Sequence, residues 1–234
     1  MEKTTLLYEG KAKQVYKTQV EDQYIVHYKD DATAFNGEKK GTITGKGSIN
    51  NQMSNILFEM LEKEGIPTHL IKELNELETL VKAVEILPLE VIIRNVAAGS
   101  ISKRLGIEEG TLLEFPVLEF CYKNDDLGDP MINEYHIKAM GLAGEEDLLI
   151  IKNMTFKIND LLKRFFLDKG IKLIDFKLEY GYAGDKIVLA DEISPDTCRL
   201  WDEKTNEKLD KDRFRRDMGN VIEAYKNVFS RIGE

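Results

Sequence analysis

LIDFKLEYG, residues 173–181, predicts a strand with one apolar face and one charged face. Residues two apart on a strand share one face. The apolar positions are Ile174, Phe176 and Leu178, and the charged positions between them are Asp175, Lys177 and Glu179. A second apolar run, residues 187–190, follows a glycine-containing turn and predicts a hairpin that ends in Asp191 and Glu192. Three charges on one strand face require partners or ligands.

The returning strand of this hairpin brings Asp191 opposite residues 177–179, although a sequence does not fix the register of a hairpin. Glu179 and Asp191 are therefore expected within reach of one hard cation. Mg²⁺ is usually held by one or two carboxylates together with nucleotide phosphates. The alternative is a solvated face with cross-strand ion pairs. Residues 193–201 continue with a mixture of polar and apolar side chains, which is typical of a pocket wall.

Strands dominate the early chain, and helices and strands mix later, a pattern that favours an α+β fold over a doubly wound sheet. A helix is expected over residues 48–65, with Ser48 as its N-cap and Gly65 at its end. We further expect strands over 5–18, 23–30 and 68–95, loops over 36–48 and 124–144, and helices over 146–170 and 210–233. A division near residue 80 would separate a β-rich lobe, 1–80, from an α+β lobe, 81–234.

Composition limits the function classes. The 234 residues suit one large domain or two small ones, and a net charge of −9 argues against a general nucleic-acid binder. Cys121 and Cys198 lack metal-ligand spacing and indicate a reduced, cytosolic protein. The three histidines are too scattered to predict a histidine metal site. No apolar run approaches the length of a membrane span, and no signal peptide is expected.

GTITGKGS, residues 41–48, resembles a phosphate-binding P-loop without matching it. The P-loop pattern needs four residues between its glycines and a serine or threonine directly after the lysine. Here three residues separate the glycines, and Gly47 follows Lys46. We therefore do not predict a P-loop.

YEGKAKQVY, residues 8–16, predicts a turn between two strands in which Gly10 lets the backbone approach a ligand closely. Lys11 and Lys13 flank the small Ala12, so nothing bulky blocks a phosphate. The stretch resembles a nucleotide-covering hairpin in general form. Considered alone, it is better explained as an ordinary exposed turn with two solvated lysines.

EVIIRNVAAGSISKRLG, residues 90–106, predicts a short buried strand ending at Arg94, a turn of small residues, and a helix capped by Ser100. Free N–H groups at a helix N-terminus bind anions, and an arginine adds a bidentate donor for carboxylate or phosphate. An equally simple interpretation is a strand–turn–helix junction whose arginine is a surface charge.

Taken together, the chain resembles the SAICAR synthetase (phosphoribosylaminoimidazole-succinocarboxamide synthase) family of purine biosynthesis over essentially its full length. Six blocks in the same order are more specific than any one motif. They are YEGKAKQVY (8–16), LPLEVIIRNVAAGSISKRLGI (87–107), KNDDLGDPMIN (123–133), LIDFKLEYG (173–181), DEISPDTCRLWD (191–202) and DKDRFRRD (210–217).

The resemblance implies a two-lobed α+β fold related to ATP-grasp ligases and kinases. It also implies a ligase that joins L-aspartate to carboxyaminoimidazole ribotide (CAIR), with ATP converted to ADP and phosphate through an acyl phosphate. Glu179 and Asp191 would bind Mg²⁺, and Asp175 and Lys177 would lie between nucleotide and acceptor. The implied ATP contacts are Lys11, Ala12, Lys13, Val15, Lys82 and Lys123, and the implied ribotide contacts are Arg94, Ser100, Asp196, Arg199 and Arg215. The loop 36–48 is the least familiar part, so Asn36 and Lys40 receive no role.

We expect a cytoplasmic enzyme, a homodimer with small-molecule substrates and without nucleic-acid or membrane partners. Two other function classes are a small-molecule kinase of similar two-lobed shape and a catalytically silent nucleotide-binding module. A kinase would phosphorylate a hydroxyl and would not need aspartate. The intact set of Lys177, Glu179 and Asp191 speaks against the silent module.

Overall fold

The computed structural model describes residues 1–34 and 37–233, and its strands form two large antiparallel sheets. The first sheet has the order β1-β2-β3-β7-β6. Its strands are β1 (Leu6–Glu9), β2 (Lys13–Lys17), β3 (Gln23–Tyr28), β6 (Leu70–Asn75) and β7 (Glu78–Lys82). Helix α1 (Lys46–Lys63) packs beside it, and a separate ribbon pairs β4 (Asp31–Ala34) with β5 (Lys39–Thr42).

The second sheet has the order β10-β9-β8-β11-β12, with β13 also paired to β11. Its strands are β8 (Glu85–Val96), β9 (Leu112–Tyr122), β10 (Met131–Ile132), β11 (Ile171–Ala183), β12 (Lys186–Ala190) and β13 (Cys198–Asp202). The other helices are α2 (Ser100–Leu105), α3 (Glu134–Met140), α4 (Glu145–Asp168), α5 (Asp212–Arg215) and α6 (Val221–Ile232), with a short 3-10 turn, η1, at Asp125–Leu127. The mixture of helices with antiparallel sheets confirms the α+β prediction.

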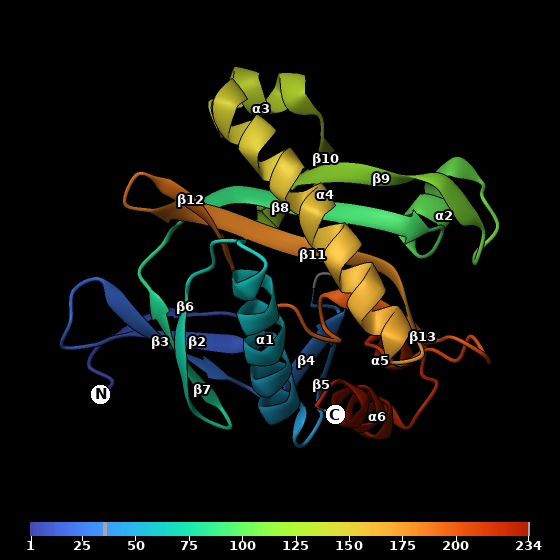
Figure 1. The fold of residues 1–234 in the computed structure, drawn as a ribbon, viewed down its shortest axis with the longest axis horizontal. Helices are drawn as coiled ribbons and strands as arrows, with labels where there is room; N and C mark the ends of the chain where they lie inside the picture. Colours follow the sequence, from blue (N-terminus) through green and yellow to red (C-terminus); the bar gives the residue numbers. More distant parts are fainter. Residues whose placement is uncertain (35–36, 234) are drawn as a thin grey trace.

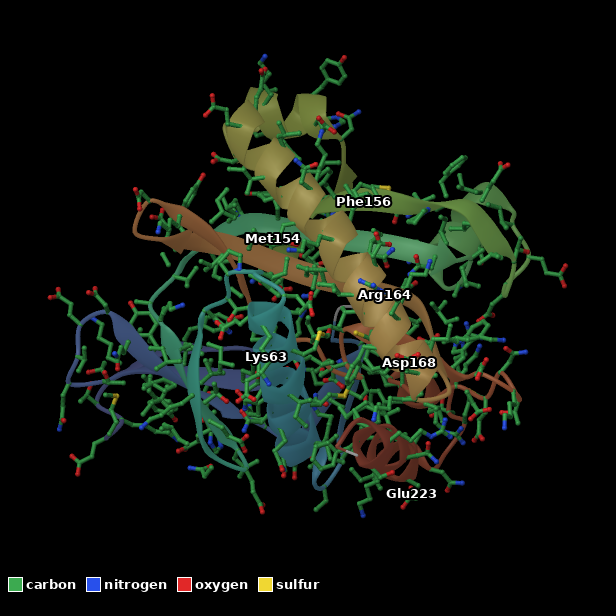
Figure 2. The ribbon with its side chains drawn as sticks, viewed as in Figure 1. Lys63, Met154, Phe156, Arg164, Asp168 and Glu223 are labelled. Carbon is green, nitrogen blue, oxygen red and sulfur yellow. The ribbon has the colours of Figure 1, made fainter. Side chains whose placement is uncertain are left out.

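Helix α4 covers one face of the second sheet, and Figure 1 shows it running diagonally across β8 and β11. Its buried residues, among them Ile151, Ile158 and Leu162, recur at the spacing of one helix face. Phe156 and Arg164, labelled in Figure 2, lie on its exposed side. The main core joins this buried stripe to residues of α1, α6 and the second sheet. The opposite face of the sheet is therefore left for charged side chains.

Strand β11 is the centre of the second sheet, because it pairs with β8, β12 and β13. Phe176 and Leu178 face the main core as predicted. Ile174 does not share their environment, since it packs in a smaller cluster with Ala98 and Trp201. The pairing with β13 shifts register between Leu173 and Asp175, and such a bulge interrupts strict alternation.

Two segments that were predicted as loops, 36–48 and 124–144, contain strands or helices, so these two predictions were wrong. The loop 36–48 contains strand β5, and α1 begins at Lys46 after Gly45, so Ser48 is not its N-cap. Lys40 lies on β5, whereas Asn36 lies outside the described residues. The loop 124–144 contains α3, which the side chain of Asn133 caps by accepting from the backbone N–H groups of residues 135 and 136.

The C-terminal helix expected over 210–233 is two helices, α5 and α6. Asp217, Gly219 and Asn220 all have positive φ angles, between 50° and 69°, which a right-handed helix does not tolerate. The first sheet ends at Lys82 and the second begins at Glu85. A division of the chain into lobes at residue 80 stays a prediction.

Replacement of Leu178 by alanine tests whether β11 anchors the core. Leu178 is 1% exposed, so Leu178→Ala should lower the free energy of unfolding by about 2–5 kcal/mol. Leu167→Ala on α4, where the side chain is 51% exposed, is the matched control and should change it by less than about 1 kcal/mol. Urea unfolding measures both, and equal losses would contradict the central place of β11.

Candidate functional site

A row of three charges crosses the sheet at Asp175. Arg94 on β8 and Arg199 on β13 lie directly opposite Asp175 on the two neighbouring strands. Nη1 of Arg94 donates to the Asp175 carboxylate at 2.9 Å, and Nη1 of Arg199 donates to it at 2.8 Å. Asp175 and Arg94 are 4% and 3% exposed. Because buried charges must be paired, this row fixes the side chains of three strands relative to one another.

Arg94 is not the surface charge of the second sequence interpretation, whereas its role as a donor to an anion stays a prediction. It lies inside β8 and is buried, so it is neither the end of a strand nor a surface charge. Its Nε donates to Glu119 at 2.7 Å, and its Nη2 donates to the hydroxyl of Ser100 at 3.0 Å. Ser100 is the first residue of α2 and makes no capping bond, so the predicted cap was wrong.

Gly99, which precedes α2, has a structural reason to be glycine. Its φ angle is 61°, and a Cβ at this position would collide with the guanidinium of Arg199. The missing side chain therefore lets Arg199 lie against the turn. Arg199 is also held from the other side, where its Nε donates to Asp212 at 2.9 Å.

The other end of the charged strand is rich in carboxylates. Lys177 donates to Glu90 at 2.9 Å and to Glu179 at 2.7 Å, and Lys123 also pairs with Glu179. Burial alone would lower the pKa of Lys177, but Glu179, Asp191 and Glu90 together raise it well above its ordinary value. The carboxylates at this end therefore keep Lys177 charged.

Asp191 follows β12, and Glu179 pairs with Ala190, so the hairpin brings Asp191 beside Glu179 as predicted. Asp191 has a φ of 59°, a left-handed conformation that aspartate tolerates better than most residues. Lys13 pairs with Asp191 and, at 3.1 Å, with Glu192. Burial would raise the pKa of Asp191, but Lys13, Lys177 and Lys123 hold it below its ordinary value.

Two adjoining cavities lie over this charged face. One, of about 460 Å³, we call the arginine cavity. It is lined by Arg94, Ser100, Asp175, Lys177, Asp196, Arg199 and Arg215, together with other residues. The other, of about 410 Å³, we call the carboxylate cavity. It is lined by Lys11, Ala12, Lys13, Lys123, Lys177, Glu179, Asp191 and Asp196, together with other residues.

The residues that the family resemblance assigned to the ribotide all line the arginine cavity, and most of those that it assigned to nucleotide phosphates and metal line the carboxylate cavity, with Lys11 and Asp196 lining both. Val15 and Lys82 line neither cavity. Val15 packs beside Val26 and Tyr28 in the first sheet, and the ammonium of Lys82 donates to the carbonyl of Thr68 at 2.8 Å.

The two cavities carry opposite formal charges. Six cationic side chains and four carboxylates line the arginine cavity, an excess of two positive charges. Five cationic side chains and seven carboxylates line the carboxylate cavity, an excess of two negative charges. Lys177 lines both cavities and lies between the two ends. The first cavity therefore suits an anion, and the second suits a cation accompanied by lysine-bound phosphates.

Lys46 and Lys211 are site residues that the sequence did not reveal. Lys46, from the P-loop-like stretch, is fully buried and donates to Asp196 at 2.9 Å. No phosphate loop is formed there, since the carboxylate of Asp30 accepts from the backbone N–H groups of Gly45 and Gly47. Lys211 lines both cavities and also contacts Asp196. Neither lysine lies in a spacing pattern that could have predicted these contacts.

A buried carboxylate pair lies behind the arginine cavity. Asp212 pairs with Arg199 and, at 2.5 Å, with Arg215. Asp210 is fully buried and accepts from two backbone N–H groups, Asp212 at 2.7 Å and Leu200 at 2.8 Å. Burial, aided by the charge of Asp212, raises the pKa of Asp210 to about 7. Asp210 thus ties β13 to α5, the elements that carry Arg199 and Arg215.

Within residues 1–34 and 37–233, no three histidine, cysteine, aspartate or glutamate side chains converge as a metal-binding group. A site of one or two carboxylates completed by phosphates does not require such a group. None of the helices in the described part of the chain has the length and hydrophobicity needed to cross a bilayer.

Comparison with known proteins gives one consistent result. The SAICAR synthetase family model matches residues 6–232. The chain is 64% identical over 233 residues to the phosphoribosylaminoimidazole-succinocarboxamide synthase of Lachnoclostridium phytofermentans, covering 100% of this chain and 99% of that protein. A crystal structure of the Ehrlichia chaffeensis synthase has a TM-score of 0.96 at 48% identity, covering 98% of each chain. A SAICAR synthetase in complex with ADP has a TM-score of 0.94 at 50% identity, covering 97% of each chain. The relation to ATP-grasp ligases and kinases stays a prediction.

Asp210 should make the stability of the protein depend on pH. Its pKa of about 7 lies above the ordinary 3.8, so the folded state keeps a proton that the unfolded state loses first. Stability from this group is therefore present below about pH 4 and is lost as pH rises to about 7, by an amount on the order of a few kcal/mol. Asp210→Asn removes the titration.

Urea unfolding at several pH values between 4 and 8 measures this difference. The variant should gain stability relative to the unmodified protein as pH rises. A constant gap across this range would contradict the protonated state of Asp210.

Proposed function

The chain belongs to the SAICAR synthetase family, and we propose that its two adjoining cavities divide the substrates of that family between them. The enzyme is an ATP-dependent, amide-forming ligase of purine biosynthesis. It joins L-aspartate to the carboxylate of CAIR and yields SAICAR, ADP and phosphate. The charge difference between the arginine and carboxylate cavities is the observation that carries the proposed division.

The ribotide would bind in the arginine cavity, whose surplus of cations suits a phosphate and a carboxylate. Arg94 and Arg199 would supply the nearest donors, with Ser100 and Arg215 beside them. Each of these arginines already pairs with a carboxylate, so the guanidinium groups are held in place before the ligand arrives. Such preorganisation reduces the entropy lost on binding.

The nucleotide phosphates would lie in the carboxylate cavity, under Lys11 and Lys13, with Lys123 on the other side. The adenine would extend past Val15 toward Lys82 at the end of β7. Ala12 lies between the two lysines of the turn and presents no side chain beyond Cβ. The ADP complex of a related structure supports the use of ATP by this fold.

Mg²⁺ fits the donor chemistry of this cavity, because Glu179 and Asp191 offer oxygen ligands in a site with surplus negative charge. When bound, the ion would reduce the negative charge of the phosphates. Lys13, Lys123 and Lys177 pair with the same carboxylates. These lysines would turn from the carboxylates to the phosphates as nucleotide enters.

In this reaction the protein would mainly position the substrates and offset their charges, without forming a covalent bond to them. The carboxylate oxygen of CAIR attacks the γ-phosphorus of ATP, the bond from that phosphorus to the bridging oxygen breaks, and ADP leaves. The amine of aspartate, after losing a proton, attacks the acyl carbon, and the bond from that carbon to the phosphate oxygen breaks. Lys177 borders both cavities and would offset the negative charge where acceptor and phosphate meet, while Asp175 would hold the two arginines in position.

A kinase would release ADP without aspartate, whereas this ligase requires ribotide, ATP and aspartate for sustained turnover. ADP release measured with each substrate omitted in turn separates the two functions. The full-length likeness to SAICAR synthetases favours the ligase. We retain as proposals a homodimer, a cytoplasmic location and the absence of nucleic-acid partners.

Asp191→Asn tests the metal assignment. The change keeps the size of the side chain and removes its charge, so turnover should fall about a hundredfold, or about 3 kcal/mol in the barrier. Asp185→Asn, in the exposed turn between β11 and β12, is the matched control and should retain activity. Rate measured against magnesium concentration is the readout. Near-normal activity of the Asp191 variant at low magnesium would rule out this role.

Arg199→Lys tests the ribotide assignment. Lysine keeps the charge but cannot bridge Asp175 and Asp212 as the guanidinium does. Calorimetric titration should show ribotide affinity reduced about tenfold or more, about 1.4 kcal/mol, with ATP affinity little changed. Arg164→Lys, on the exposed side of α4 where the guanidinium donates to a backbone carbonyl of its own helix, is the control. Equal losses for both ligands would indicate general disruption instead.

A further inference from the structure

The third substrate must reach the boundary between the two cavities. In the proposed arrangement, the acyl phosphate forms where the ribotide carboxylate meets the γ-phosphate. An amine can attack only if it is held within about 3–3.5 Å of the acyl carbon. L-Aspartate carries two carboxylates besides its amine, so its site needs a cation at this boundary that existing carboxylates do not fully neutralise.

Three lysines line both cavities and therefore lie at the boundary: Lys11, Lys177 and Lys211. Lys177 is held by two carboxylates, Glu90 and Glu179. Lys11 pairs with Asp125 at 2.7 Å on an exposed part of the surface. The positive charge of each of these two lysines is therefore balanced or outweighed by the negative charge of its own carboxylate partners.

Lys211 differs because its carboxylate is shared. Asp196 accepts from Lys46 at 2.9 Å and from the hydroxyl of Tyr225 at 2.7 Å, whereas Lys211 lies at 3.4 Å. Lys46 is fully buried, so water does not solvate its ammonium group, and Asp196 is the carboxylate that balances its charge. Two ammonium groups thus share one carboxylate, which leaves one positive charge at the boundary.

The pKa directions agree with this distribution of charge. Burial lowers the pKa of Lys211, as do the nearby charges of Arg215 and Lys46. The carboxylates of Asp196 and Glu192 offset these effects only in part. For Lys13 and Lys177, burial acts in the same direction, but their carboxylate partners raise the pKa well above its ordinary value. The positive charge of Lys211 is therefore less fully balanced by carboxylates than the charges of Lys13 and Lys177. A carboxylate of the incoming substrate would provide the additional negative charge.

We propose that Lys211 binds a carboxylate of L-aspartate at the boundary of the two cavities, and that Lys46 acts as a positioning residue by holding Asp196. This inference rests on the proposed division of substrates. It gives the P-loop-like stretch 41–48 a role that differs from phosphate binding. It also explains why a lysine is buried at the start of α1.

Lys211→Met removes the charge and keeps most of the length of the side chain. With ATP and ribotide saturating, the KM for L-aspartate should rise at least about tenfold, while the KM values for ATP and ribotide stay within about twofold. Lys211→Arg, which keeps the charge, should recover part of the aspartate affinity. Lys208→Met is the matched control, because Lys208 pairs with Glu109 away from both cavities and should leave all three constants unchanged.

Hydroxylamine in place of aspartate separates binding from phosphoryl transfer, since it traps an acyl phosphate and carries no carboxylate. The Lys211→Met variant should release ADP with hydroxylamine and ribotide at a rate within about threefold of the unmodified enzyme. A selective loss of the hydroxylamine reaction, or an unchanged KM for aspartate, would overturn the proposal.

An error in the proposed function would give a different experimental result from an error in the role of Lys211. If the unmodified enzyme released no hydroxylamine-dependent ADP, the acyl-phosphate route itself would be in error, and the KM for aspartate alone would then decide the role of Lys211. Lys46→Met provides an independent check. Its aspartate KM should rise while its ATP KM stays unchanged, and a drop in thermal stability with all KM values unchanged would contradict the positioning role.

Discussion

The pairing of buried Asp175 with Arg94 and Arg199 is the interaction on which the rest of the site depends. One carboxylate on β11 is shared by arginines on the strands to either side, so three strands are fixed by one set of charges. Breaking such a buried set leaves an uncompensated charge, which costs about 3–5 kcal/mol. The same arginines line the arginine cavity, so the contacts that order the sheet would also prepare the proposed anion site.

A single strand separates the two kinds of charge that the reaction brings together. Asp175 and Glu179 lie on one face of β11, and four residues of strand span about 13 Å. Arg94 and Arg199 flank the first position. The second position has the carboxylates of Glu90 and Asp191 nearby, with Lys177 between the two positions. In the proposed arrangement, this strand would keep the anionic acceptor and the nucleotide phosphates with their metal at a set distance. This division explains why a central strand carries charge on one face and packs into the core with the other.

The sequence predicted the central strand, its hairpin and the closeness of Glu179 and Asp191, because strand alternation and tight turns are local properties. It did not predict the bulge that separates Ile174 from Phe176, since a bulge depends on the partner strand. The carboxylate partners of Arg94 were also missed, because Glu119, for example, is distant in the sequence and reaches Arg94 only when β8 and β9 pair. Lys46 and Lys211 depend in the same way on contacts across the molecule, where no spacing rule applies. The family resemblance supplied the residue roles that local patterns left open.

A crystal structure of this protein with ADP, magnesium and the ribotide bound would test the division of the site most directly. We expect the ribotide phosphate or carboxylate at Arg94 and Arg199, and the ADP phosphates with the metal beside Glu179 and Asp191. Lys177 should then lie between the two ligands. The reverse arrangement, with nucleotide phosphates on the arginines and the ribotide beside Glu179, would rule out the proposed division of the two cavities.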